Sequence, residues 1–138
     1  MRKLLCILLV APLISCALLP GGMRTLPPET QIAHEAVIVQ TALLSIQTTI
    51  ISLNEAKIIT DPVTRQTLDY IKQVNTIAGL LKGALETWHL YGTSGAATSL
   101  FDSYKRAVKD LKAGMPATAL QNLNIMANLK ALLAAYGG

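Results

Sequence analysis

The fold is decided by residues 29–59, whose sequence is ETQIAHEAVIVQTALLSIQTTIISLNEAKII. Apolar residues recur in this stretch at spacings that alternate between four and three: Ile32, Ala36, Val39, Leu43, Ile46, Ile50 and Leu53. This heptad seam predicts one long amphipathic helix from Glu29 to about Ile59. A second apolar stripe lies beside the seam with a period of seven, at Val37, Leu44, Ile51 and Ile58. We expect the widened apolar face to contact two neighbouring helices, as in a bundle.

A second helix is predicted from Asp61 to about Tyr91. Asp61 is suited to the N-cap, and Pro62 to the first helical position. Apolar residues again step by three and four, at Leu68, Ile71, Val74, Ala78, Leu81, Leu85 and Trp88. The following Gly92-Thr93-Ser94-Gly95 is a turn signal that ends this helix.

Two shorter helices are predicted after that turn. Ser94 is the expected N-cap of the third helix, Gly114 its end, and Pro116 the start of the fourth. The fourth helix is expected to face inward with Leu120, Leu123, Met126, Ala127, Leu133 and Tyr136. No segment alternates strictly with β-branched enrichment, so no sheet is expected. The predicted fold is all-α, a small bundle of two helical hairpins with about four helices, forming a single domain over residues 29–138.

Composition agrees with one folded domain. The chain has 138 residues, which is too short for two ordinary domains. Of these residues 51% are hydrophobic and 14% are charged, a composition that excludes a disordered chain. The net charge of +4 is too small to indicate nucleic-acid binding. Part of that charge, Arg2 and Lys3, lies in a segment that we predict is removed.

The N-terminus has the plan of a signal peptide. Positive Met1-Arg2-Lys3 precedes an apolar run from Leu4 to Ile14, which is shorter than the roughly 20 residues needed to span a bilayer. The run ends in Leu13-Ile14-Ser15-Cys16, which resembles the lipobox of bacterial lipoproteins. The resemblance implies that residues 1–15 are removed and that Cys16 carries the lipid, including the amide-linked fatty acid, typically palmitate.

That resemblance also implies a location. Acyl chains on Cys16 would hold the protein at a bacterial membrane, and Ala17 in the next position is typical of outer-membrane sorting, with the domain facing the periplasm. Residues 16–28 contain three prolines and two glycines after Cys16 and are expected to form a short linker. An ordinary secretory peptide or an N-terminal membrane anchor is the alternative interpretation.

Residues suited to catalysis or metal binding are few. Glu86 and His89 form a single Glu-x-x-His, whereas di-iron bundles carry this motif on two helices with further glutamates opposite. Adjacent His34 and Glu35 point about 100° apart on a helix. We therefore expect no catalytic residues, no metal site and no cofactor, and we expect that the protein is not an enzyme.

Two surface features of the predicted helices bear on binding. A basic strip is expected on the third helix, at Lys105, Arg106, Lys109 and Lys112, partly offset by Asp102 and Asp110. The strip is either a solvated bundle face or a contact for anionic headgroups or an acidic partner. Aromatic residues surround the second turn and are expected in the core: Trp88, Tyr91, Phe101 and Tyr104.

Together these features favour a membrane-anchored lipoprotein that acts as a non-catalytic scaffold or accessory subunit of a bacterial envelope complex. Its expected partners are the membrane, through Cys16, and an envelope protein or a second copy of itself. The alternative is a small membrane-active phage protein, holin-like, with spanning segments at residues 4–19 and 36–54. Against that alternative stand eight polar residues expected to face water: Gln40, Thr41, Ser45, Gln47, Thr48, Thr49, Ser52 and Asn54.

Overall fold

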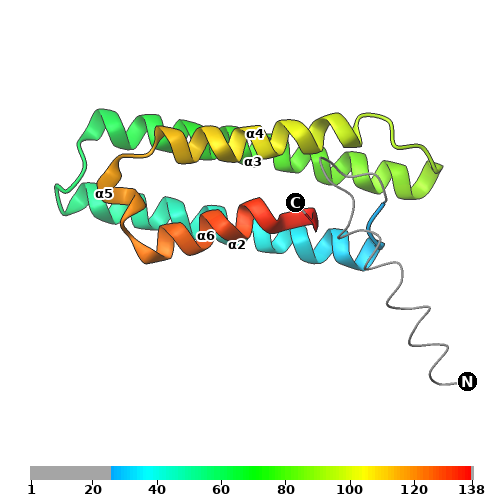
Figure 1. The fold of residues 1–138 in the computed structure, drawn as a ribbon, viewed down its shortest axis with the longest axis horizontal. Helices are drawn as coiled ribbons and strands as arrows, with labels where there is room; N and C mark the ends of the chain where they lie inside the picture. The colour runs from blue at the N-terminus through cyan, green and yellow to red at the C-terminus, as the bar shows by residue number, and fades with distance from the viewer. Residues whose placement is uncertain (1–25, 138) are drawn as a thin grey trace, which may run out of the picture.

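The computed structural model describes residues 26–137, and nearly all of them are helical (Figure 1). The long helices are α2 (Glu29–Glu55), α3 (Asp61–Tyr91), α4 (Ala97–Gly114) and α6 (Leu123–Ala134). A short helix, α5 (Ala117–Leu120), precedes α6, and a 3-10 turn, η1 (Ala135–Gly137), follows it. No strand occurs within residues 26–137, so the predicted all-α bundle is confirmed.

Successive long helices run in opposite directions along one axis (Figure 1). Helix α3 packs against α2 on one side and α4 on the other, while α2 also packs against α6. Helices α4 and α6 touch less extensively, near the end of the chain. The result is an up-down-up-down four-helix bundle, the arrangement that short connections between amphipathic helices favour.

The predicted heptad seam of α2 forms one wall of the core. The seam residues from Ile32 to Ile50 are buried, and only Leu53 is half-buried. Helix α3 contributes five of its predicted positions: Ile71, Val74, Ala78, Leu81 and Leu85. Burial of this many aliphatic side chains, at about 25 cal/mol per Å² of apolar surface, is the main force that holds the helices together.

Helix α2 ends earlier than predicted. It stops at Glu55 rather than near Ile59, because Lys57 has a positive φ of 61° that breaks the helical path. The chain then turns so that Ile59 is buried, and its carbonyl accepts a hydrogen bond of 3.2 Å from the Asn54 amide. The hydrophobic periodicity continued to Ile59 because that side chain is in the core, although its backbone is in a turn.

Two predicted N-caps are wrong. Helix α3 is preceded by Thr60, which makes no side-chain cap, while Asp61 is the first helical residue and accepts a bond of 2.8 Å from Asn54. Helix α4 begins at Ala97 after Ala96 rather than directly after Ser94. The intervening residues form a turn in which Ser94 contributes its backbone carbonyl, not its hydroxyl.

The predicted fourth helix is broken in two. The chain leaves α5 at Gln121, and Asn122 caps α6 by accepting a bond of 3.1 Å from the Ile125 amide. This break changes the helical phase, so Leu123 and Ala127 are exposed, contrary to the prediction. Other residues take the inward positions: Ala119, Ile125, Leu129 and Leu132. Tyr136 is buried as predicted, and Met126, Leu133 and Leu120 are half-buried.

Candidate interaction surface

The apolar stripe of α2 is exposed, which corrects the expectation that it contacts a second helix. Val37 is 60% exposed, Leu44 64% and Ile51 37%, and Ile58 in the following turn is also exposed. On a straight helix, residues seven apart drift by only about 20° per heptad, so these side chains lie in one line, about 10 Å apart, with exposed polar residues between them. The bundle buries the seam beside the stripe and leaves the stripe itself to solvent.

The second neighbour of α2 packs on its polar side instead. On α6, Asn124 donates through Nδ2 to Ser45 Oγ at 3.0 Å and to Thr49 Oγ1 at 2.8 Å. Asn128 donates to Ser45 Oγ at 3.1 Å. Ser45 and Thr49 are therefore half-buried interhelical partners, not the water-facing residues that the sequence indicated. Helix α6 thus packs on the Ser45–Thr49 side of α2 and leaves the apolar stripe uncovered.

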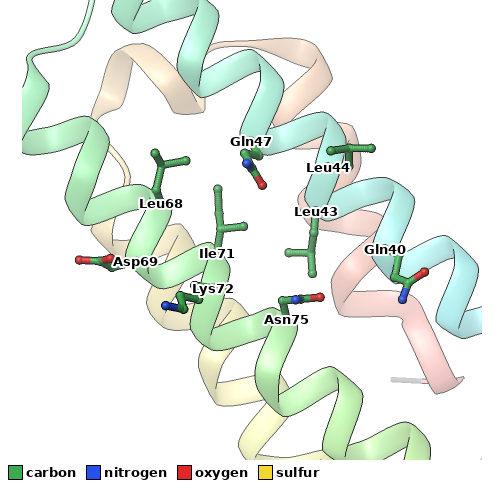
Figure 2. Close-up of a pocket in the computed structure, with 9 residues that line it drawn as sticks. All are labelled: Gln40, Leu43, Leu44, Gln47, Leu68, Asp69, Ile71, Lys72 and Asn75. Atoms are coloured by element: carbon green, nitrogen blue, oxygen red, sulfur yellow. The ribbon is translucent and has the colours of Figure 1, made fainter.

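A groove between α2 and α3 borders the stripe, with a volume of about 490 Å³. Its lining residues are Gln40, Leu43, Leu44, Gln47, Leu68, Asp69, Ile71, Lys72 and Asn75. Figure 2 shows Leu43 and Ile71 pointing into the space between the two helices, and Asp69 pointing away from it. The groove floor is thus aliphatic, and Leu44 belongs both to the groove and to the stripe.

The charges near this surface are sparse. Helix α2 contains no lysine or arginine, and residues 36–54 carry no charged side chain at all. Polar residues beside the stripe are neutral amides and hydroxyls, such as Gln40, Thr41, Gln47 and Thr48. A partner could therefore cover the α2 side of this surface without desolvating a charge, which is the costly part of burying a polar surface; the charges nearby are Asp69 and Lys72 on the α3 side of the groove.

The predicted basic strip lies on α4. Lys105 is half-buried, with its ammonium 5.4 Å from the centre of the Phe101 ring, an arrangement that combines cation–π attraction with burial of the side-chain stem. Arg106, Lys109 and Lys112 are exposed. In the described part of the chain, neither Asp102 nor Asp110 forms an ion pair with them. Arg106, Lys109 and Lys112 therefore form an exposed basic face, with half-buried Lys105 on the same helix.

The candidate catalytic groups are dispersed. Glu86 pairs with Lys82 at 3.1 Å, and His89 Nε2 lies 4.0 Å from Glu29 Oε2 at the start of α2. His34 is exposed and half-buried Glu35 follows it. Among residues 26–137 no group of three or more His, Cys, Asp or Glu side chains is placed to hold a metal ion. The first contact lies within α3 and the second links the end of α3 to the start of α2, and neither lies among the groove-lining residues.

The aromatic residues divide between core and surface. Phe101 and Tyr104 are buried and Trp88 is half-buried, as predicted, but Tyr91 is exposed at the end of α3. Nothing in the residue pattern indicated that Tyr104 pairs with Tyr136; the two rings meet edge to face with their centroids 6.2 Å apart. Burial raises the pKa of Tyr104. The pKa of Tyr136 is raised to about 12, mainly by burial and to a smaller extent by the nearby negative charge of Glu35.

Cys16 and the signal peptide predicted for residues 1–15 lie outside the described residues, as does most of the linker. The lipobox interpretation therefore stays a prediction. No protein-family model, curated protein or solved structure matches the chain. Function is accordingly inferred from the residues of this chain.

Proposed function

We propose that this protein is a bacterial lipoprotein of the cell envelope whose helical domain is a non-catalytic interaction module. In this proposal, acyl chains on Cys16 hold the domain at the membrane, and the domain contributes a scaffold or accessory contact without catalysing a reaction. The observation that carries the interaction role is the exposed apolar stripe of α2 next to the groove. An uncovered stripe of large apolar side chains is typical of a protein-binding surface.

The anchor is supported by the sequence of residues 1–16. A charged start, an apolar run and a cysteine at the junction occur together in Met1 to Cys16. Two or more acyl chains give stable membrane attachment, whereas one chain alone gives marginal binding. We propose outer-membrane attachment facing the periplasm, on the basis of Ala17 in the position after the cysteine.

The anchor is tested by the intact mass of the protein purified from membranes. We expect a chain that begins at Cys16 and carries added acyl mass, and we expect that an inhibitor of the lipoprotein signal peptidase prevents its formation. The Cys16→Ala variant is the control and should lack the acyl mass. A chain that keeps Met1 in untreated cells would contradict the proposed anchor. Separation of inner and outer membranes then tests the location.

A second candidate is a holin-like, membrane-active phage protein. The observation in its favour is that α2 is long and apolar enough to cross a membrane by length and composition. Spanning would require α2 to leave the bundle and give up its seven buried residues, including Ile46 and Ile50. Under this candidate, the Cys16→Ala variant resists alkaline extraction and is released from the membrane only by detergent. Under the lipoprotein proposal, alkali releases this variant from the membrane, unless its uncleaved N-terminal segment holds it there.

A further inference from the structure

Within α2, which ends at Glu55, the three exposed apolar residues of the stripe are symmetric about Leu44, while Ile58 lies in the following turn. Val37 lies seven residues before Leu44, and Ile51 lies seven residues after it. If a second α2 helix is laid antiparallel so that the two Leu44 side chains face each other, Val37 of each copy lies opposite Ile51 of the other. Each exposed apolar residue between positions 37 and 51 then meets an apolar residue.

We propose that two copies of this chain associate through this stripe, with their α2 helices antiparallel and Leu44 at the two-fold axis. An isologous contact of this kind requires a surface that is complementary to itself. The residues on both flanks meet that requirement. On one flank Gln40 of each copy comes beside Gln47 of the other, so amide meets amide. On the other flank Thr41 comes beside Thr48, so hydroxyl meets hydroxyl.

The charges of α2 favour the antiparallel direction over the parallel one. Glu55 lies on the same side of the helix as the stripe, at its C-terminal end. A parallel pair would bring the two Glu55 carboxylates together, and α2 has no lysine or arginine to offset them. In the antiparallel pair each Glu55 lies opposite exposed Ala33 instead.

The same composition argues for a second copy rather than a lipid surface. Helices that lie on anionic membranes carry lysine and arginine along the flanks of their apolar face. On α2 the flanks of this stripe carry only neutral side chains, the α3 side of the groove carries one charge of each sign, Asp69 and Lys72, and the basic strip lies on a different helix, α4. A neutral, self-complementary stripe on α2 fits an identical stripe without desolvating a charge of α2.

The size of the contact indicates reversible association. The stripe from Val37 to Ile51 spans about 21 Å of helix. Stable interfaces bury about 800 Å² on each partner, more than three side chains and the groove margin supply. If the proposed anchor is present, confinement to a membrane raises the local concentration and favours the pair. This last step alone rests on the proposed function.

Cysteine crosslinking of the full chain tests the contact. Leu44→Cys is compared with Leu80→Cys, because Leu80 is a matched exposed leucine, at 57%, on α3. Both variants keep Cys6 and Cys16, and the unsubstituted chain gives the background from these. With a short bifunctional maleimide, we expect a dimer from Leu44→Cys in several-fold excess over Leu80→Cys, both in membranes and in concentrated detergent solution.

The direction of pairing is tested with two further variants. Mixed chains carrying Val37→Cys and Ile51→Cys should crosslink to each other more than either crosslinks to itself. Preferential self-crosslinking of Val37→Cys would overturn the antiparallel register. Equal crosslinking of Leu44→Cys and Leu80→Cys would overturn the contact, and so would crosslinking of Leu44→Cys only to a different protein.

A charge exchange provides an independent readout. Leu44→Lys and Leu44→Glu each place like charges at the two-fold axis, so each alone should lower self-association by about tenfold, as loss of a central apolar anchor does. Co-expression of the two, with different tags, should restore co-purification. Failure of the pair to associate better than either variant alone would overturn the proposal. The anchor is measured separately by mass, so either result can fail without the other.

Discussion

The phenolic oxygen of Tyr104 on α4 donates a hydrogen bond of 2.7 Å to the backbone carbonyl of Leu132 on α6. Both residues are fully buried, so the bond satisfies two polar groups that would otherwise lack a partner in the core. It also joins the two helices at the side of the bundle where their packing is least extensive. The end of the chain is thereby fixed against α4.

Removal of this hydroxyl should destabilise the bundle. Tyr104→Phe leaves the Leu132 carbonyl buried without that donor, and we expect a loss of about 1–3 kcal/mol in the free energy of unfolding. Urea denaturation followed by circular dichroism measures the change. Tyr91→Phe is the matched control, because Tyr91 is 74% exposed, and it should change stability by less than about 0.5 kcal/mol. Equal effects of the two substitutions would contradict this role of Tyr104.

The buried tyrosines should make the fold sensitive to alkali. An ordinary tyrosine has a pKa of about 10 in the unfolded chain, whereas burial raises the pKa of Tyr136 to about 12 and that of Tyr104 further. The folded state therefore binds more protons than the unfolded state above pH 10. Stability is fully present below pH 10 and should fall above it, by about 1.4 kcal/mol per pH unit for each tyrosine. Denaturation at pH 9, 10 and 11 measures the slope.

The same titration has an internal control. Tyr136→Phe removes one of the two raised pKa values, so the slope of stability between pH 10 and 11 should fall by about half. A slope that is identical in the parent protein and in Tyr136→Phe would show that Tyr136 does not cause the alkaline loss.

The long helices could be predicted from sequence because the core enforces their periodicity. Ile32 to Ile50 and Ile71 to Leu85 are spaced so that only one helical face can bury them all. The ends were predicted less well. Ile59 continues the pattern from within a turn, and Asn122 starts a helix where the apolar residues alone indicated a continuous one. The position of a helix end depends on capping bonds and on the conformation of the adjacent residues. Hydrophobic periodicity contains no information about either.

The interaction surface illustrates a second limit. The period of seven in the stripe was visible, but periodicity does not distinguish a buried face from an exposed one. The side of α2 that receives α6 carries the bonds between Asn124, Ser45 and Thr49, whose separation in sequence exceeds 70 residues. A pair of asparagines one turn apart, at 124 and 128, is the signal that could have indicated a polar seam.

The asparagine contact should contribute measurably to stability. Asn124→Ala removes the two bonds that this side chain donates to α2 and the longer one that it accepts from Ser45, and we expect a loss of about 1 kcal/mol despite the higher helix propensity of alanine. Asn75→Ala is the control, because this exposed asparagine makes no side-chain hydrogen bond within the described chain. A double-mutant cycle with Ser45→Ala should give a non-zero coupling energy. Additive effects would contradict a direct contact between α2 and α6 at these residues.

Two glycines should respond to alanine in opposite ways. Gly83 lies within α3 and has open space around the position of a Cβ, so Gly83→Ala should stabilise the protein by about 0.5–1 kcal/mol. Gly114 ends α4 where an added Cβ would overlap the ring of Tyr70 on α3. Gly114→Ala should therefore destabilise the bundle, by about 1–3 kcal/mol.

The ring of Tyr70 provides the test of this explanation. In a Tyr70→Ala background the added methyl group of Gly114→Ala no longer meets an aromatic ring, so its cost should disappear or become a small gain. Thermal and urea denaturation of the two single variants and the double variant measure the difference. If Gly114→Ala is equally destabilising in both backgrounds, the close approach of α3 and α4 is not the cause, and the strain lies instead in the turn from Gly114 to Pro116.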